Sequence, residues 1–234
     1  MAQYAGLPLA ISYTIRPANA LAVVLFSLFV LVHYRKQFPR FLLWASPVAA
    51  IFIGWNWMTY RALFSSYYQL RPPLDFSMTT LRGISEALAG NLISPSRGLL
   101  IFTPLMCFAI YGMWRAWRDR WAAPLGRWLV CLVMLHWLFI SLYYQFWWGG
   151  HSYGPRLWSD MSPLLVLLLV PAWEYIHGRT TRWVFVICLA VSFLIHARGA
   201  TQWRVNMWNA VPVNVDQHPE RVWDWRDPQF LRDL

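Results

Sequence analysis

The distribution of basic residues constrains the fold of this chain more than any other feature. Lys and Arg are absent from six apolar stretches of helical length, and a bilayer crossing takes roughly 20 residues with help from flanking Trp, Tyr and Arg. The stretches are Ala18–His33, Phe41–Thr59, Gly98–Trp114, Trp128–Trp147, Ser162–His177 and Trp183–Ala197. This pattern predicts an all-α fold, a multi-pass membrane bundle of about six transmembrane helices.

Three short linkers between these stretches hold nine of the chain's 20 basic residues in 25 positions. They are Tyr34–Arg40, Arg115–Arg127 and Gly178–Arg182. Because short cytoplasmic loops of membrane proteins carry an excess of Lys and Arg, we expect these linkers on the inside. Both termini are then expected outside.

Composition excludes several other classes of protein. Hydrophobic residues make up 58% of the chain and 17 residues are Trp, which is not the composition of an ordinary soluble domain. The net charge of +10 is spread over short loops without a basic stripe, so we expect no nucleic-acid partner. The cysteines Cys107, Cys131 and Cys188 all lie in apolar stretches without metal-ligand spacing, so we expect no metal and no cofactor.

We expect residues 1–234 to form a single membrane-embedded helical unit with an outward tail at 198–234. The outward segment Tyr60–Arg97 contains a helical pattern over Thr80–Asn91. Its apolar residues share one face of the helix and include Leu81, Ile84 and Leu88. That pattern is typical of a helix lying on a membrane surface.

Two outward turns place an arginine beside glycine and proline. Arg97 follows Ser94-Pro95-Ser96, and Arg156 follows Gly154-Pro155. A guanidinium binds phosphate through a planar fork of donors, and glycine lets backbone amides approach an anion. We expect Arg97 and Arg156 to bind the phosphate of a lipid carrier. The alternative is that each anchors the protein at the lipid headgroups.

Four further residues are candidates for a sugar or acceptor cavity. His151, Tyr153 and Tyr68 could stack on a sugar and bond to it, and Asp160 follows Arg156 by one helical turn. For the first three, ordinary placement in an interfacial aromatic belt is the alternative. His136, in the middle of a stretch, is expected to bond to a neighbouring helix. A functional role, as an ionisable group inside the membrane, is the alternative.

The chain lacks several common functional patterns. The centres of the apolar stretches contain no Asp or Glu, which disfavours a proton relay or a cation-coupled transporter. The phosphate-binding GxxxxGK[ST] pattern, HExxH and GxSxG are also absent, so the commonest ATPase and hydrolase classes are excluded.

The chain resembles the C-type membrane glycosyltransferases of bacteria, which include protein mannosyltransferases and the aminoarabinose transferase of lipid A. The motifs that carry this resemblance lie in the expected outward segments and at the end of the tail. They are Arg16-Pro17-Ala18-Asn19, Ser94-Pro95-Ser96-Arg97-Gly98-Leu99-Leu100, Trp147-Trp148-Gly149-Gly150-His151-Ser152-Tyr153-Gly154-Pro155-Arg156 and Trp223-Asp224-Trp225. The resemblance implies a bacterial inner-membrane enzyme that takes a sugar from a polyprenyl phosphate on the outer face.

The chain departs from the family pattern in two respects. Members carry acidic catalytic residues in an outward loop after their first span and have about twice as many spans as this chain, which therefore resembles the C-terminal half of the family. Asp75 and Glu86 are the only acids in the first long outward segment, and neither matches a family motif. The catalytic residue is therefore unknown, and a polypeptide supplying the N-terminal half is an expected partner. The alternative function is a non-catalytic membrane scaffold or assembly partner.

Overall fold

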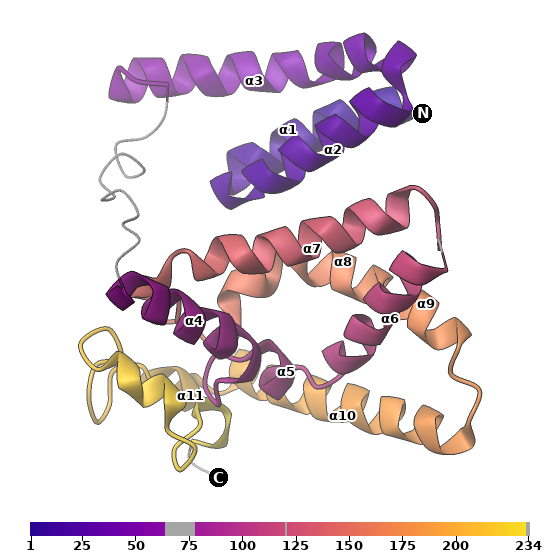
Figure 1. Cartoon of the computed structure of the whole chain (residues 1–234). Coiled ribbons are helices and arrows are strands. Elements are labelled where there is room, and N and C mark those ends of the chain that lie inside the picture. Colours follow the sequence, from indigo (N-terminus) through magenta and orange to yellow (C-terminus); the bar gives the residue numbers. More distant parts are fainter. Residues whose placement is uncertain (64–77, 120, 233–234) are drawn as a thin grey trace. The chain divides into compact units, whose positions relative to one another are not determined.

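The computed structural model describes residues 1–63, 78–119 and 121–232. The chain divides into two compact units, Met1–Asp75 and Phe76–Leu234, whereas the sequence predicts one unit over residues 1–234. Every regular element in the described ranges is a helix (Figure 1), which confirms the predicted all-α class. Tyr68 and Asp75, which the sequence analysis named, lie outside the described residues.

The first unit contains three α-helices, α1 (Gly6–Ile15), α2 (Ala20–His33) and α3 (Phe38–Tyr60). Helix α1 was not expected from the sequence, and it packs mainly against α3. Gly6 makes this contact possible, because a Cβ there would collide with the Phe41 carbonyl. Helix α1 is therefore held by a close contact between backbones. Such a contact depends on glycine and not on a periodic row of apolar side chains, so the sequence did not reveal this helix.

Helix α3 continues through a proline in its interior. Pro47 has no N–H to offer the carbonyl of Leu43, four residues earlier. The Ser46 hydroxyl donates to that Leu43 oxygen instead, at 2.9 Å. The orphaned carbonyl is thus satisfied locally, which explains why this long apolar helix is not interrupted.

The second unit contains the remaining α-helices of the described chain. They are α4 (Met78–Ile93), α5 (Leu99–Phe102), α6 (Met106–Arg118), α7 (Leu125–Ser141), α8 (Ser162–Leu167), α9 (Leu169–Glu174), α10 (Arg179–Thr201) and α11 (Trp203–Met207). Helix α4 packs against α7, and α6 packs against α9. Short 3₁₀ turns at Arg156–Met161, Pro219–Trp223 and Gln229–Leu231 join or end these elements.

All six apolar stretches contain α-helix, but three of them are not continuous, and the fourth leaves its α-helix at Ser141 before the 3₁₀ turn Tyr144–Phe146. The third stretch breaks between α5 and α6 at Thr103-Pro104, where proline lacks the N–H that would continue the helix. The fifth breaks at Leu168, between α8 and α9. Pro171 has no N–H to donate to the carbonyl of Leu167, four residues earlier, so one helical hydrogen bond is missing at this break. The sequence predicted continuous helices at all three places.

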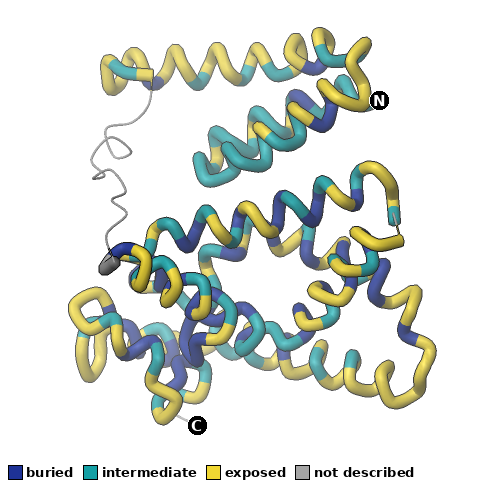
Figure 2. Tube along the Cα trace, viewed as in Figure 1, coloured by how far each residue is buried: buried dark blue, intermediate teal, exposed yellow. Residues whose placement is uncertain are grey.

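Two helices are long and apolar enough to cross a membrane, judged by length and composition. They are Arg35–Tyr60, which is α3 with its preceding turn, and Arg179–Thr201, with mean hydropathies of 1.4 and 1.8. Only 11% of the residues in each apolar window are buried, so their side chains face outward, as the exposed colouring of α3 and α10 shows (Figure 2). The helices Pro17–His33 and Leu125–Ser141 are apolar but shorter. Six complete crossings remain a prediction.

The predicted surface helix over Thr80–Asn91 exists as α4, but it packs through a different face. Its buried side is lined by small and polar residues, namely Thr80, Ala87, Gly90 and Asn91. Of the predicted apolar face, Leu81 is 47% exposed, while Ile84 and Leu88 are half-buried. Helix α4 therefore packs against the bundle with its small and polar side chains, and its leucine side is only partly buried.

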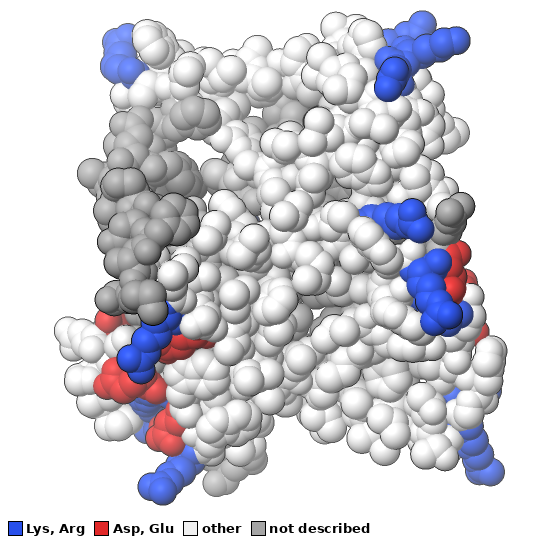
Figure 3. Space-filling model, in the orientation of Figure 1, with Lys and Arg blue, Asp and Glu red and all other residues white. Residues whose placement is uncertain are grey.

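Charged side chains in the second unit gather at two places on the face drawn in Figure 3. One group lies over α4 and the C-terminal segment. The other lies on the opposite side of the view, over the turn between α6 and α7 and the start of α10, with uncharged surface between the two sides. A band of uncharged surface between charged ends is the distribution that a membrane-embedded unit requires.

Candidate functional site

The residues expected to bind a ligand lie in three segments of the second unit, which together form what we call the cap. These are the turn at 94–98, the glycine turn at 147–156, and the tail at 202–232. Their shared core contains Trp147, Trp148, Trp208, Val215 and Val222, packed with Ala87 of α4. The tail thus folds back onto the preceding loops with its own large apolar side chains.

Arg97 lies inside the cap, with only 2% of its surface exposed. Its Nε donates to the Trp148 carbonyl at 2.8 Å, and its Nη2 donates to the carbonyl of Gly150 at 3.2 Å and to Asn209 Oδ1 at 2.7 Å. Its Nη1 donates to the Ser96 carbonyl and to Gln229 Oε1, both at 2.7 Å. All five donors of the guanidinium are therefore engaged by the protein.

This arrangement changes the interpretation of Arg97. Burial lowers the pKa of the guanidinium to about 9, so the group is still a cation at neutral pH. It has no spare N–H for a phosphate in this conformation, and it ties the 94–98 turn, the glycine turn and the tail together. The structure therefore favours a structural role for Arg97, whereas the sequence predicted a phosphate ligand.

A second buried cation supports the same core. Arg221 donates to the carbonyls of Trp208, Val211 and Val213 and pairs with Asp227 at 2.9 Å. The guanidinium carbon of Arg221 lies 4.2 Å from the centre of the Trp208 ring, and that of Arg97 lies 5.4 Å from it. Trp208 therefore packs against two arginines, a contact that stabilises the tail beneath the glycine turn.

Arg156, in contrast, is exposed at the surface of the cap. Its Nη1 donates a long hydrogen bond of 3.5 Å to the Gly149 carbonyl. Gly149 and Gly150 have φ values of 72° and 67°, a backbone conformation that favours glycine. In this conformation the carbonyls of Gly149 and Gly150 accept from Arg156 and Arg97 respectively, so both arginines are fixed to one turn.

His151 lies at the edge of the same turn and contacts the tail. Its Nε2 is 3.0 Å from Asn214 Oδ1 and 3.8 Å from Asp216 Oδ2. Asp216 is held from the other side by the Trp148 indole N–H, which donates to Oδ1 at 2.9 Å. The side chains of His151 and Asp216 are 45% and 38% exposed, so this pair is open to solvent.

Tyr153 and Asp160 occupy different surroundings from His151. The Tyr153 hydroxyl donates to the Ile195 carbonyl of α10 at 2.7 Å, and its ring packs on Gly199 and edge-on to Phe102. Burial raises the pKa of this hydroxyl to about 12. Asp160 is half-buried in the 3₁₀ turn Arg156–Met161. The structure therefore brings His151 and Arg156 to one turn and points Tyr153 toward α10.

His136 has the structural role that its position predicts. Its ring is 1% exposed, and Nε2 donates to the Leu157 carbonyl at 2.9 Å. This bond joins α7 to the 3₁₀ turn that follows the glycine turn. His136 thus positions the segment that carries Arg156.

Sequence analysis missed four residues that the structure places in the cap, namely Asn209, Asn214, Asp216 and Gln229. Gln229 is fully buried, and its amide donates to the Ser152 carbonyl at 2.9 Å while its oxygen accepts from Arg97 and from the Gly154 N–H. The available signal was the density of Trp, Asn and Asp in the tail, which is unusual for a disordered end.

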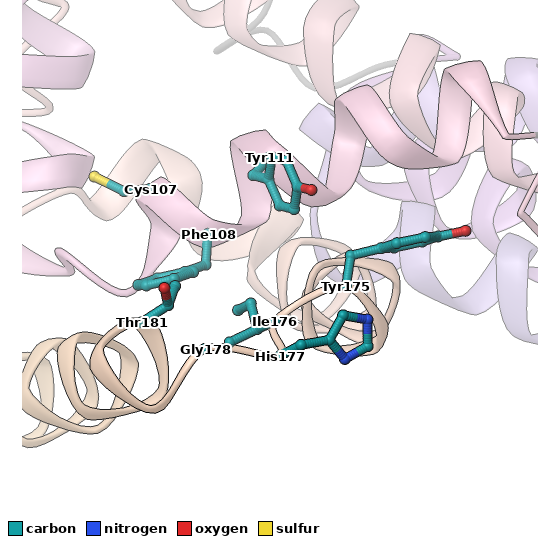
Figure 4. A pocket seen from close by; sticks show the side chains of 8 residues that line it. All are labelled: Cys107, Phe108, Tyr111, Tyr175, Ile176, His177, Gly178 and Thr181. Atoms are coloured by element: carbon teal, nitrogen blue, oxygen red, sulfur yellow. The ribbon is translucent and has the colours of Figure 1, made fainter.

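A separate cavity of about 510 Å³ lies near the turn between α9 and α10 (Figure 4). Its wall is mostly aromatic and apolar, with Phe108 and Tyr111 from α6 and with Tyr175, Ile176 and His177 from the turn. On one side, the Arg115 guanidinium stacks on Tyr175 at 3.3 Å and pairs with Asp119. The stacking and the ion pair hold Arg115 beside this cavity.

Within the described ranges, no group of three or more His, Cys, Asp or Glu side chains is arranged to hold a metal ion. No protein-family model, curated protein or solved structure matches this chain. Its function is therefore proposed from the cap and from the charge pattern of the sequence.

Proposed function

We propose that this chain is a multi-pass protein of the bacterial inner membrane with both termini outside. The support comes from the two long apolar helices, whose side chains face outward, and from the basic residues concentrated in alternate linkers. The cap then lies on the outer face, because the glycine turn and the tail follow the outward ends of the fourth and sixth apolar stretches.

We propose further that the cap binds the phosphate of a polyprenyl-phosphate sugar, as in a membrane glycosyltransferase of the C type. One observation carries this proposal: exposed Arg156 and His151 lie on a single turn whose shape is held from beneath by a buried arginine. A fixed turn presents Arg156 at low conformational cost, and a guanidinium forms charge-assisted bonds to phosphate. Arg156 is the phosphate ligand, and Arg97 acts through the turn.

The catalytic acid or base is not among the residues assigned here, and a polypeptide corresponding to the N-terminal half is the proposed partner that supplies it. In this proposal the cap binds the phosphate and positions the sugar, and the partner supplies the catalytic residue. Together they form one complete donor site. The lipid bilayer and the polyprenyl-phosphate sugar are the other partners.

A non-catalytic scaffold is the second candidate function, and the Arg97 network favours it. A buried arginine whose five donors all bind protein stabilises a fold whether or not a ligand is present. In this alternative the cap is an assembly surface, and Arg156 only anchors the protein at lipid headgroups.

Binding of a polyprenyl-phosphate sugar to purified protein in detergent distinguishes the two functions. The variants are Arg156→Lys and Arg156→Gln, with Arg226→Gln as the control, because Arg226 is an exposed arginine elsewhere in the tail. Loss of a charge-assisted fork should weaken binding about 10- to 100-fold for either Arg156 variant and leave the control unchanged. Equal affinity in all four proteins would leave the scaffold function standing.

A further inference from the structure

We propose that Asp216 and His151 form a sugar-recognition pair that accepts hydrogen bonds from hydroxyl groups of the donor's glycosyl unit. This inference rests on the proposed function, in which Arg156 binds the adjoining phosphate. It assigns a role to Asp216, a tail residue 60 positions after Arg156 that no sequence motif marks.

The hydrogen bonds of the pair fix its chemistry. Asn214 Oδ1 accepts the backbone N–H of Asp216 at 2.9 Å, so this atom is an acceptor and His151 Nε2 must donate to it at 3.0 Å. In a neutral imidazole the other nitrogen, Nδ1, is then an acceptor. A carboxylate and an imidazole nitrogen on one exposed edge form a site that accepts hydrogen bonds, which matches the hydroxyl donors of a sugar.

Asp216 is also held in place before any ligand arrives. The Trp148 indole N–H binds Oδ1, and the backbone bond to Asn214 fixes the turn that carries Asp216. Trp148 is 7% exposed and sits in the cap core. One carboxylate oxygen is thus used for positioning, while the side chain as a whole is 38% exposed to a ligand. Such preorganisation lowers the entropic cost of binding.

The glycine turn brings the pair and the phosphate ligand together. Asp216 Oδ1 lies 3.7 Å from the point that a Cβ on Gly150 would occupy, and the neighbouring Gly149 carbonyl accepts from Arg156. Arg156 and Asp216 thus both lie against the two-glycine segment, and His151 follows it directly in the chain. A glycosyl phosphate offers the complementary set, with oxyanions at one end and hydroxyls at the other.

The matched variant is Asp216→Asn, which keeps an oxygen for the Trp148 N–H but removes the charge. Asp224→Asn is the control, because Asp224 is an exposed tail carboxylate away from the glycine turn, and its Oδ1 accepts the backbone N–H of Arg226 at 2.9 Å. His151→Ala removes the second acceptor. Thermal unfolding of each variant, followed by Trp fluorescence, establishes that the cap is folded.

The test compares binding of two lipids, a polyprenyl phosphate and the same lipid carrying a sugar. Wild type should bind the sugar-bearing lipid about tenfold or more tightly than the bare phosphate. Asp216→Asn should erase that difference and leave bare-phosphate binding unchanged, His151→Ala should reduce it, and Asp224→Asn should preserve it.

Three outcomes would overturn the inference while the phosphate site stands: equal binding of both lipids by wild type, an Asp216→Asn variant that retains the full sugar preference, or one that loses both lipids equally. Failure of wild type to bind either lipid would instead overturn the proposed function on which the inference rests.

Discussion

At the scale of single residues, Arg97 shows how one side chain can organise three segments. Its acceptors come from the 94–98 turn, the glycine turn and the tail, and Gln229 lies 132 residues away in sequence. A lysine has three donors on a point charge and cannot reproduce the planar fork, so buried acceptors would be left unpaired. We expect Arg97→Lys to destabilise the second unit by about 2 to 5 kcal/mol.

Thermal unfolding in detergent measures this effect, and the fluorescence of Trp208, which packs against Arg97, is part of the signal. Arg226→Lys is the control and should unfold like wild type, because Arg226 is exposed. An Arg97→Lys variant as stable as the control would mean that the hydrogen bonds to Arg97 contribute little, and would return this residue to the candidate phosphate ligands.

Tyr153 gives a prediction with a defined pH dependence. Removing its bond to the Ile195 carbonyl in Tyr153→Phe should cost about 0.5 to 1.5 kcal/mol at pH 7. Because the folded-state pKa of about 12 lies above the ordinary value of 10, the folded protein holds this proton more tightly than the unfolded chain. The stabilisation is therefore complete below pH 10 and is lost as the pH rises toward 12.

Unfolding temperatures of wild type and Tyr153→Phe, measured from pH 8 to pH 11.5, test this prediction. The gap between the two proteins should stay constant up to about pH 10 and then narrow. A gap that widens with pH would contradict the proposed environment of the hydroxyl.

Some site residues could be predicted from the sequence and others could not. The Gly149-Gly150 and Gly154-Pro155-Arg156 signals are local, so the turn and the exposed Arg156 follow from backbone preferences alone. Asp216 and Gln229 gain their roles from partners 68 and 132 residues away. The burial of Arg97 also depends on the tail, because Asn209 and Gln229 accept two of its hydrogen bonds, and this contact could not be read from the sequence around Arg97.

At the scale of elements, α4 shows that hydrophobic periodicity does not always identify the packed face. Gly90 lies directly against the Trp147 ring, and Gly83 lies against the Tyr144 ring. Close approach of large aromatic rings selects small residues, so the buried stripe of α4 looks featureless in the sequence, while the leucine stripe remains available to lipid. Proline also interrupts helices in this chain, near Pro104 and Pro171. Helix α3 continues through Pro47, where the Ser46 hydroxyl donates to the carbonyl of Leu43, to which the proline cannot donate.

We expect Gly90→Ala to destabilise the second unit by about 1 to 3 kcal/mol, although alanine favours helices. A Cβ at this position would overlap the Trp147 ring, so either the ring or α4 must shift. Ser85→Ala, at an exposed position on the same helix, is the control and should change stability by less than about 0.5 kcal/mol. Chemical unfolding of both variants makes the comparison, and a Gly90→Ala protein more stable than the control would rule out this packing.

At the scale of the whole molecule, the charge pattern and the packing carry different information. Each apolar stretch predicted from the absence of Lys and Arg contains α-helix in the structure, although the third, fourth and fifth stretches are interrupted. The division into Met1–Asp75 and Phe76–Leu234 was not predictable, since it reflects which helices contact one another. The sequence predicted a tail after the last apolar stretch, but not that this tail buries Arg97 and its own Arg221.

The orientation of the chain is the last prediction, and it follows from the nine basic residues in three linkers. In a background with Cys107, Cys131 and Cys188 replaced by serine, single cysteines are introduced at Gln217 in the tail and at Ala123 in the α6–α7 turn, both exposed positions. An impermeant thiol reagent added to intact cells should label Gln217→Cys, because the tail is expected outside. It should label Ala123→Cys only after the membrane is permeabilised, because Arg115–Arg127 is the most basic linker. If only Ala123→Cys were labelled in intact cells, the chain would have the opposite orientation to the predicted one. The cap would then lie on the cytoplasmic side and could not receive a donor from the outer face.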